Sequence, residues 1–470
     1  MKNRKRRKRS PLTKYLFVSI FLVSFIVLFL IHFIDILPKN YFIILVGLFM
    51  TINIIFSALL FSRNNVVSGF GKFFSAVYMI LLIIATVYEL NTIDFLKKIG
   101  DSEYLTINYS IVALKDSKYK EIEDIKDEKL GIVNTYGEEV LNKINKKVSV
   151  SYYKSSNYTQ LADKLLDRSL KVVLLEDSSI DILKEEDPEF TKKIKTIYKF
   201  SIDIKQKSIK DKVDITEEPF NVYISGIDTY GSVNSVSRSD VNIVMTVVPS
   251  TGKIILTFIP RDYYVKLYNI NEYDKLTHAG IYGVESSVKT IEDLLGIDIN
   301  YYIKLNFSSL IKTVDTINGI TVDSKYTFRS QDGYRYTRGK NNLDGKKALS
   351  FVRERKNLPN GDISRGENQI AVLTAIIDKA TSSSIITKYN SLIKTLKQSF
   401  VTNFSNNEIT DFVKNQIDKN IKWEIESITL DGDDAFEYTY SYRKNKLYVM
   451  LPNQDAVNNA TKIINDNFTK

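Results

Sequence analysis

The chain has 470 residues, 44% of them hydrophobic, which is enough for two or three domains with buried cores. It contains no cysteine, which excludes disulfides, thiolate zinc sites and a cysteine nucleophile, and its only histidines, His32 and His278, argue against a His-rich metal site or a Ser-His-Asp triad. The formal net charge of +10 invites a nucleic-acid interpretation, but eight basic residues and no acid occupy positions 1–14, and the remainder is nearly neutral. We therefore expect no nucleic-acid partner.

Three long apolar segments follow this basic tail, at Tyr15–Ile34, Tyr41–Phe61 and Phe73–Leu90. Each has about the 17–25 residues that a helix needs to cross a bilayer. The first segment is too long for a signal peptide, and no small-residue cleavage site closes it before the second begins. The sequence therefore predicts a basic tail at 1–14 and three transmembrane helices within 15–90.

The charges beside these segments predict their orientation. The basic tail and the loop Ser62–Lys72, which carries bases and no acid, suit the cytoplasmic side, whereas the balanced loop Asp35–Asn40 can cross the membrane. Three crossings then place everything after residue 91 outside. We expect a multi-pass protein of the cell membrane with a cytoplasmic N-terminus and extracellular main domains.

The first outer region, 101–210, alternates strand-like and helical patterns. Thr106–Leu114 and Leu170–Leu175 are typical of strands, and Tyr158–Leu166 has apolar residues at helical spacing. This alternation predicts a small accessory α/β domain. The pattern resembles one lobe of an extracellular solute-binding protein, and the alternative is a spacer or interaction module.

The second outer region, 219–404, follows a polar linker at Lys205–Glu218. Its predicted strands are Phe220–Ile227, then Asn242–Val248 and Lys253–Ile259 joined as a hairpin through Pro249–Gly252, and Gly319–Val322. Its predicted helices are about Val284–Leu295, Phe307–Ile317, Asp344–Val352 and Arg365–Ala380. This order predicts a layered α/β fold. We expect residues 405–470 to form a C-terminal α/β extension, ending in a helix near Ala456–Phe468, and leave open whether it is a separate domain.

Arginine is concentrated in one part of this region. The chain has 15 arginines against 50 lysines, and eight of the arginines lie between residues 238 and 365. A guanidinium group offers a planar fork that binds phosphate through two parallel hydrogen bonds. The clustering favours phosphate recognition, and the alternative is a set of structural ion pairs.

Charged residues stand at the ends of the predicted strands. Asp228 follows the first strand, Arg238 and Asp240 precede the second, and Arg261 and Asp262 follow the third. Ligands of α/β proteins bind in crevices at strand ends, so we expect these groups to share a site. The alternative for each aspartate is a turn or helix-capping role.

A second charged cluster lies farther along the chain, and its members are Arg353, Arg355, Asp362, Arg365 and Gln369. Arg353 and Arg355 are two apart and would share one face of an extended segment, whereas Arg365 and Gln369 are four apart and would share one face of a helix. We expect Asp362 in the loop Asn357–Ser364, ahead of a helix N-terminus that favours anions. Alternatively, Ser364 caps that helix and Asp362 interacts with its dipole.

The oxygen ligands of these clusters suit a hard cation, Mg²⁺ or Mn²⁺, rather than zinc. The sequence has no Walker A loop, no kinase motif set and no Rossmann glycine pattern. A nucleotide-driven reaction therefore has no support.

At these residues the chain resembles the LytR–CpsA–Psr (LCP) family, and within it the CpsA-like members of capsule gene clusters. The matching stretches are Ile224–Asp228, Arg238–Asp240, Phe258–Asp262, Asp274–Gly280 and Phe351–Gln369. The match covers about 219–404 and implies an LCP phosphotransferase domain with a central mixed sheet flanked by helices. The three membrane segments and the accessory domain also fit the CpsA-like architecture. One departure is Asn318-Gly319, where many members have two glycines.

The resemblance implies a Mg²⁺-dependent glycopolymer–peptidoglycan phosphotransferase of a Gram-positive envelope. It would move a cell-wall polymer, such as teichoic acid or capsule polysaccharide, from a polyprenyl-pyrophosphate carrier to peptidoglycan through a phosphodiester link. By the same resemblance Asp228 and Asp240 hold the metal, and Gln369 orients phosphate oxygens that five arginines bind: Arg238, Arg261, Arg353, Arg355 and Arg365. The lipid would lie in an apolar cavity between sheet and helices. The general base is left open between Asp262 and Asp362, and His278 either touches phosphate or is structural.

Two other functions remain open from the sequence. A polyprenyl-pyrophosphate phosphohydrolase would use the same residues, with water replacing the acceptor hydroxyl. A non-enzymatic membrane-bound regulator of envelope polymer synthesis would instead sense a solute through residues 101–210.

Overall fold

The computed structural model describes residues 11–34, 37–98, 104–205, 213–228, 233–382 and 399–468. The chain divides into two compact units, one formed by residues up to 99 with 405–421 and the other by 100–404 with 422–470. Most of the predicted basic tail and part of the predicted linker at 205–218 lie outside the described residues.

The first unit contains the apolar N-terminal helices, which are α1 (Pro11–Ile34), α2 (Lys39–Leu60) and α3 (Asn65–Lys98). Within the described chain, these three helices are long and apolar enough to cross a membrane, as predicted. Their large side chains face outward, with Phe25 67% and Phe29 56% exposed, as expected of a surface that contacts lipid. The same unit includes α14 (Asn406–Lys419), which Ser405 caps by accepting a hydrogen bond from the Glu408 amide.

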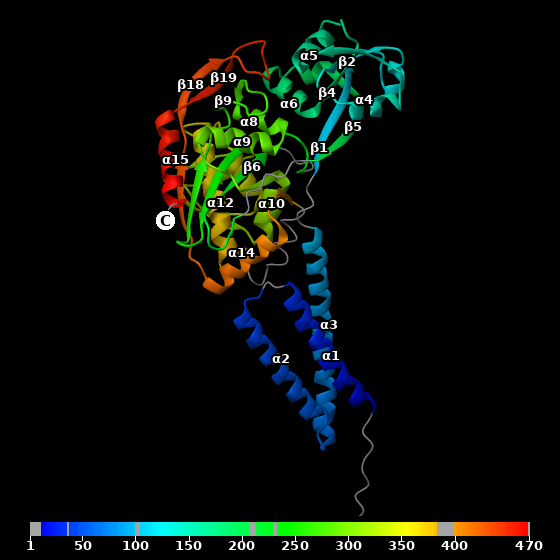
Figure 1. Ribbon diagram of the computed structural model, residues 1–470, viewed down its shortest axis with the longest axis vertical. Helices are drawn as coiled ribbons and strands as arrows, with labels where there is room; N and C mark the ends of the chain where they lie inside the picture. Colours follow the sequence, from blue (N-terminus) through cyan, green and yellow to red (C-terminus); the bar gives the residue numbers. More distant parts are fainter. Residues whose placement is uncertain are drawn as a thin grey trace, which may run out of the picture. The chain divides into compact units, whose positions relative to one another are not determined.

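The accessory part of the second unit is an α/β sandwich (Figure 1). Its described strands form one sheet in the order β3-β2-β4-β1-β5, in which β2, β3 and β4 are parallel and β1 is antiparallel to β4 and β5. The elements are β1 (Tyr104–Leu114), β2 (Lys129–Val133), α4 (Glu138–Asn145), β3 (Ser151–Ser155), α5 (Tyr158–Leu166), β4 (Val172–Glu176), α6 (Asp177–Glu186), α7 (Phe190–Lys193) and β5 (Ile194–Lys205). The predicted alternation of strands and helices is thus present in this segment.

A central mixed sheet organises the rest of the unit. Its order, over the described residues, is β16-β11-β6-β7-β8-β17, with β6 parallel to β11, β8 parallel to β17 and the other pairs antiparallel. The strands are β6 (Phe220–Ile227), β7 (Val241–Val248), β8 (Lys253–Phe258), β11 (Tyr301–Asn306), β16 (Phe400–Thr402) and β17 (Glu424–Thr429). All residues of β6 are buried, because helices cover both faces of the sheet.

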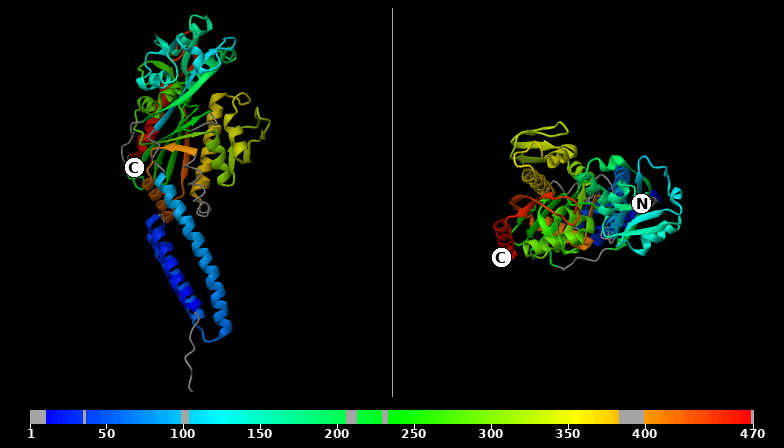
Figure 2. Two further views of the ribbon diagram at one scale, coloured as in Figure 1. Left: turned by 90° about the vertical axis from the view of Figure 1, so that its right-hand side faces the viewer. Right: turned by 90° about the horizontal axis from the view of Figure 1, so that it is seen from above.

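Two groups of helices form these covering layers (Figure 2). On one side, α9 (Val284–Leu295) and α15 (Gln454–Phe468) share a core with Tyr223 and Val244 of the sheet. On the other side lie α10 (Phe307–Thr316), α11 (Gly345–Arg353) and α12 (Asp362–Thr381). The central mixed sheet flanked by helices confirms the predicted fold class.

Small β elements complete the unit. They are β9 (Tyr264–Lys266) with β10 (Tyr273–Lys275), β12 (Ile320–Ser324) with β15 (Gly339–Leu343), β13 (Phe328–Arg329) with β14 (Arg335–Tyr336), and β18 (Gly432–Glu437) with β19 (Leu447–Pro452), while α8 (Leu276–Ala279) follows β10. Since β17 extends the central sheet, the fold continues past residue 404. The predicted domain boundaries otherwise stay predictions.

The start of α12 differs from the expectation. The helix begins at Asp362 rather than Arg365, because Gly361 adopts φ of 52° and turns the chain directly into the first helical turn. Asp362 is therefore a helical residue and not a loop residue. Ser364 is not the N-cap but lies inside the first turn, where its hydroxyl accepts a hydrogen bond from the Asn360 amide.

Candidate active site

The predicted strand-end charges lie at one edge of the central sheet. Since β7 is antiparallel to both β6 and β8, the end of β6, the start of β7 and the end of β8 meet at the same edge. Asp228, the segment Arg238–Asp240 and the pair Arg261–Asp262 follow or precede those strands. The topology therefore brings together the first charged cluster that the sequence indicated.

A buried hydroxyl network fixes the segment that carries Arg238 and Asp240. The Ser239 hydroxyl, fully buried, lies 2.9 Å from the Tyr223 hydroxyl and 2.8 Å from that of Ser225. The Asp240 amide donates to the Gly226 carbonyl at 2.8 Å. A Cβ at Gly280 would lie only 2.8 Å from the Ser239 nitrogen, so this glycine permits the close approach of α8 and the segment.

Asp240 and Arg261 form the central ion pair. Arg261 Nη1 lies 2.6 Å from Asp240 Oδ1, and both side chains are 12% exposed. Burial alone would raise the pKa of Asp240, but Arg261, Arg238 and Arg365 outweigh it and lower the pKa to about 2. Asp240 is thus a permanent anion, and Arg238 lies close enough to contribute to its field.

Asp262 is held away from the cavity. Its carboxylate lies 3.6 Å from Arg261 Nε and 3.5 Å from Lys275 Nζ, and the residue is 5% exposed. Both oxygens therefore face cations. This arrangement makes Asp262 a buried counter-ion for Arg261 and Lys275.

The exit of α11 places Arg353 and Arg355. Arg353 is the last residue of the helix and Glu354 continues in an extended conformation, so the two arginines do not lie on one extended segment as expected. The buried Glu354 carboxylate accepts hydrogen bonds from the backbone amides of Gln331, Arg355 and Asn357. This carboxylate fixes the backbone from which both arginines project.

The first two turns of α12 supply the last members of the second cluster. Arg365 forms an ion pair with Asp362, three residues earlier in the helix, and both side chains are nearly buried. Burial raises the pKa of Asp362 and lowers that of Arg365. Among the described residues, the Arg365 Nε, Asp362 Oδ2 and Gln369 Oε1 atoms are buried without a hydrogen-bond partner. Such atoms point to a missing polar partner at this site.

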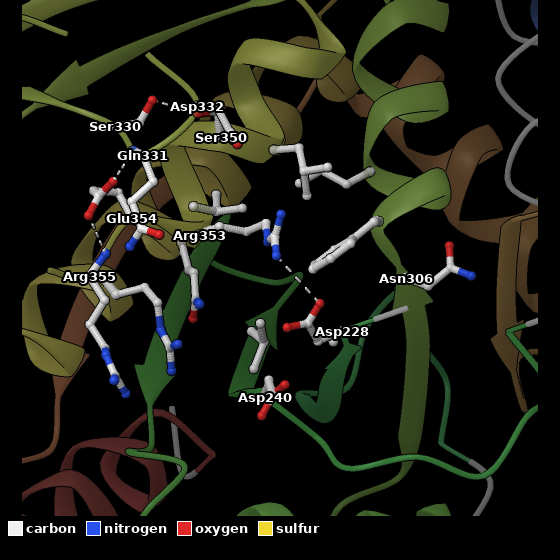
Figure 3. A pocket seen from close by; sticks show the side chains of 18 of the residues that line it. Asp228, Asp240, Asn306, Ser330, Gln331, Asp332, Ser350, Arg353, Glu354 and Arg355 are labelled. Atoms are coloured by element: carbon white, nitrogen blue, oxygen red, sulfur yellow. Dashed lines mark hydrogen bonds and ion pairs between the residues drawn. The ribbon is translucent and has the colours of Figure 1, made fainter. Parts of the chain in front are cut away.

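The two clusters meet in a cavity of about 330 Å³. Six of the predicted residues line it, namely Asp228, Asp240, Arg353, Arg355, Arg365 and Gln369. In Figure 3 the Arg353 side chain points toward Asp228, at 3.9 Å between Nη2 and Oδ1, and Asp240 lies beside them. The Arg353 guanidinium also stacks 4.4 Å from the centre of the Phe307 ring, so its direction is fixed from both sides.

The other four predicted residues are not among those that line the cavity, although Asp362 contacts Arg365, which does. Arg261 contacts Asp240, Asp362 contacts Arg365, and Arg238 and Asp262 act through the charges of those neighbours. The wall on the α10 and α11 side is apolar and includes Leu305, Phe307, Leu310 and Val352.

The environment of Asp228 disfavours its charged form. Burial raises its pKa, and the charge of Asp240 raises it further, against the opposing effect of Arg353. The charge of Asp240 therefore acts on the Asp228 carboxyl group within the cavity.

His278 has a structural place. Its Nδ1 lies 2.7 Å from Asp274 Oδ1, both residues are at most 1% exposed, and Asp274 also accepts hydrogen bonds from Ser441. It does not line the cavity. Of the two interpretations that the sequence left open, this geometry favours the structural one.

Sequence reasoning missed two residues of the site. Glu354 was not singled out, although an acid flanked by arginines in one short run was the available signal for a buried acceptor. Asn306 lines the cavity and caps α10 by accepting a hydrogen bond from the Ser309 amide. Its position directly before the predicted helix at about Phe307 was the available signal.

Known proteins resemble this chain over the same region. The model of the LytR_cpsA_psr family matches residues 189–464. A curated relative from Bacillus subtilis (strain 168), named polyisoprenyl-teichoic acid–peptidoglycan teichoic acid transferase TagU, is 36% identical over 203 residues, which are 43% of this chain and 65% of the relative. The protein of that name from Enterococcus faecalis is 38% identical over 201 residues, 42% of this chain and 66% of the relative. The matched segments thus span just under two thirds of these relatives.

Solved structures match as well. The crystal structure of B. subtilis TagU is 31% identical, with a TM-score of 0.43, over 54% of this chain and 98% of that chain. A structure described as TagT bound to LIIa-WTA is 28% identical, with a TM-score of 0.45, over 55% of this chain and 94% of that chain. The family model covers more than half of the sequence and includes every residue of the candidate site. The chain therefore belongs to the LytR–CpsA–Psr family.

Proposed function

We propose that this protein transfers a glycopolymer from a polyprenyl-pyrophosphate carrier to peptidoglycan, in a Mg²⁺-dependent reaction at the outer face of the cell membrane. Family membership and relatives named as teichoic acid transferases support the reaction class. The observation that carries the proposal is the cavity in which Arg353, Arg355 and Arg365 converge with two carboxylates beside an apolar wall. A prenyl diphosphate needs both surfaces.

The residues of the cavity fit Mg²⁺. Among the described residues no group of three or more His, Asp or Glu forms a complete metal cage. Asp228 and Asp240 nevertheless share the cavity, and burial together with the charge of Asp240 raises the pKa of Asp228. Mg²⁺ commonly binds one or two carboxylates and takes its other ligands from water and substrate phosphates. These two residues would hold it, and the bound ion would neutralise diphosphate charge.

The arginines suit phosphoryl transfer. The acceptor hydroxyl of peptidoglycan would attack the sugar-linked phosphorus, so that a phosphodiester bond forms and the bond to the prenyl phosphate breaks. Charge collects on the phosphate oxygens and on the leaving oxygen in such a step. Phe307 and Asp362 hold the guanidinium groups of Arg353 and Arg365, and Glu354 fixes the backbone at Arg355, so these groups need little rearrangement to bind that charge.

Asp362 is the better of the two base candidates. Both Asp262 oxygens face cations at 3.5 to 3.6 Å, whereas Asp362 keeps one oxygen without a hydrogen-bond partner among the described residues. Burial also raises the pKa of Asp362, which favours acceptance of the hydroxyl proton. Asp362 would then pass this proton to the leaving prenyl phosphate or to solvent, and the charge of Arg365 favours the return of the carboxylate form.

The test is transfer in vitro by the full chain in lipid nanodiscs. It would receive a polyprenyl-pyrophosphate-linked glycan, Mg²⁺ and peptidoglycan fragments, with mass spectrometry of the conjugate as the readout. We expect a phosphodiester-linked conjugate, and we expect Arg365→Ala to reduce its formation at least about a hundredfold, since a removed transition-state contact costs about 3 kcal/mol. Arg338→Ala, an exposed arginine outside the cavity, is the matched control.

Two outcomes would replace the proposal. Release of phosphate or prenyl phosphate without a conjugate, even when acceptor is present, would identify a phosphohydrolase. No turnover of the donor, with envelope polymer levels in cells unaffected by Arg365→Ala, would favour the non-enzymatic regulator.

A further inference from the structure

The segment Val233–Asp240 carries Arg238 and Asp240 to the site, and parts of two domains hold it. Its last residues are fixed by the hydroxyl network around Ser239. Its middle, around Ser235, instead contacts β1 of the accessory domain and β11 of the central sheet. What holds Ser235 therefore bears on the position of Arg238 and Asp240, three and five residues later.

Backbone pairing joins this segment to the accessory domain. The Thr106 amide donates to the Asn234 carbonyl and the Val236 amide donates to the Thr106 carbonyl, both at 3.1 Å, as a parallel bridge. At Thr106, the opposite edge of β1 pairs with β5. On the edge that faces the segment, β4 pairs only with residues 109–113 of β1. The segment thus occupies an edge of β1 that no described strand of the accessory sheet uses.

A buried lysine holds the same segment from the central sheet. Lys304 Nζ, on β11, donates to the Ser235 carbonyl at 2.7 Å, and the residue is 6% exposed. Among the described residues it forms no ion pair, and burial lowers its pKa to about 8. Burying an ammonium group without a carboxylate is costly, so its contact with this one carbonyl calls for an explanation beyond packing.

The accessory domain is firmly packed at this junction. Val236 belongs to an apolar core with Leu161, Leu165 and Tyr442. The Tyr158 hydroxyl donates to the Ser441 carbonyl at 2.6 Å, and Lys444 pairs with Asp163 at 2.8 Å. The pairing with Thr106 is therefore supported by a continuous interface.

The same contacts cover the part of the accessory domain where a solute would bind. In α/β sheets ligands bind beyond the carboxyl ends of the parallel strands. Here Val133, at the end of β2, and Tyr158, at the start of α5, pack against residues of the transferase part such as Ile281 and Tyr442. This edge is an interface between domains, so sensing of a solute there has no support.

We propose that the accessory domain, through its Thr106 pairing, and Lys304 together position the segment Val233–Asp240 and thereby set the place of Asp240 at the cavity and of Arg238 beside it. Thr106 and Lys304 are positioning residues, since neither lines the cavity. The inference rests on the proposed function, because Asp240 is one of the two carboxylates that would hold Mg²⁺ on the diphosphate. Small displacements of binding groups weaken such contacts steeply.

The test measures binding of geranyl pyrophosphate to the full chain in nanodiscs by calorimetry, with Mg²⁺ present and no peptidoglycan acceptor. Thr106→Pro removes the one amide that donates to Asn234, and the strand pairing with β5 does not use that amide. Its control is Thr106→Val, which keeps the amide and loses only the hydroxyl contact with Asp203. Lys304→Met removes the ammonium group at similar length, and Lys312→Met, at an exposed lysine of α10, is its control.

We expect Kd to rise about tenfold in Thr106→Pro and in Lys304→Met, and to stay within about twofold of wild type in both controls. In the transfer assay KM for the donor should rise by the same factor. Near-UV circular dichroism that matches wild type would show that the folded state is intact, and the second variant carries the test if the first fails to fold. Kd values equal to the controls in the folded variants would overturn the inference while leaving the proposed function standing. If the wild type binds no prenyl pyrophosphate, both fail.

Discussion

Asp240→Asn tests the ion pair at the centre of the site. The substitution keeps the shape of the side chain and removes the charge that faces Arg261 at 2.6 Å. The folded environment lowers the pKa of Asp240 from its ordinary value of 3.8 to about 2. Because the side chain is only 12% exposed, solvent screening takes little from this effect. The difference corresponds to about 2 kcal/mol of stability at neutral pH.

The sign of this contribution fixes its pH dependence. A carboxyl group whose pKa is lowered by folding stabilises the folded state above pH 3.8, and the contribution is lost as pH falls toward 2. We therefore expect Asp240→Asn to be about 2 kcal/mol less stable than wild type at pH 7 and at pH 5. By pH 3 the difference should shrink to about half.

The assay is urea unfolding of the full chain in detergent, followed by tryptophan fluorescence. The chain has one tryptophan, Trp423, directly before β17 at the edge of the central sheet, so the signal reports on the unit that holds the site. Asp323→Asn, at an exposed position of β12, is the control and should change stability by less than about 0.5 kcal/mol. Equal stability of Asp240→Asn and wild type at pH 7, or a difference that does not shrink below pH 4, would refute the reasoning.

Three further predictions follow from single contacts. Glu354→Ala leaves the backbone amides of Gln331, Arg355 and Asn357 without their acceptor. We therefore expect the free energy of unfolding in urea to fall by at least about 3 kcal/mol and the donor to bind more weakly. An unchanged KM for the donor would contradict the role given to this carboxylate. Gly366→Ala would place a Cβ about 2.4 Å from the Phe258 ring, so α12 must shift. We expect about 1–3 kcal/mol of destabilisation and a reduced kcat. A kcat equal to that of wild type would show that the site tolerates the shift of α12. Removal of divalent ions with EDTA should abolish transfer and Mg²⁺ should restore it, while undiminished transfer in EDTA would remove the metal from the mechanism.

Three of the described strands of the central sheet could be predicted closely from the sequence, whereas β11 (Tyr301–Asn306) was not predicted. Phe220–Ile227 and the hairpin that follows have continuous apolar runs bounded by polar turns, and they are β6, β7 and β8 in the structure. Helix α9 also matches its predicted bounds, because its apolar spacing is regular and the left-handed Gly296 ends it. Such local patterns are readable because burial on one face repeats with the period of the element.

Features that depend on long-range contacts could not be predicted. Nothing local shows that Glu424–Thr429 pairs with β8 and extends the central sheet beyond residue 404. The start of α12 at Asp362 depends on the positive φ of Gly361, which the sequence permits but does not require. The division of the charged residues into those that line the cavity and those that do not depends on side-chain packing that only the fold defines.

A structure of the full chain in nanodiscs with a prenyl pyrophosphate and Mg²⁺ would test the central claim most directly. It should contain the diphosphate within hydrogen-bond distance of Arg353, Arg355 and Arg365, the metal ion between the carboxylates of Asp228 and Asp240, and the prenyl chain against Phe307. A diphosphate bound outside this cavity, or a metal ion that contacts neither aspartate, would contradict it.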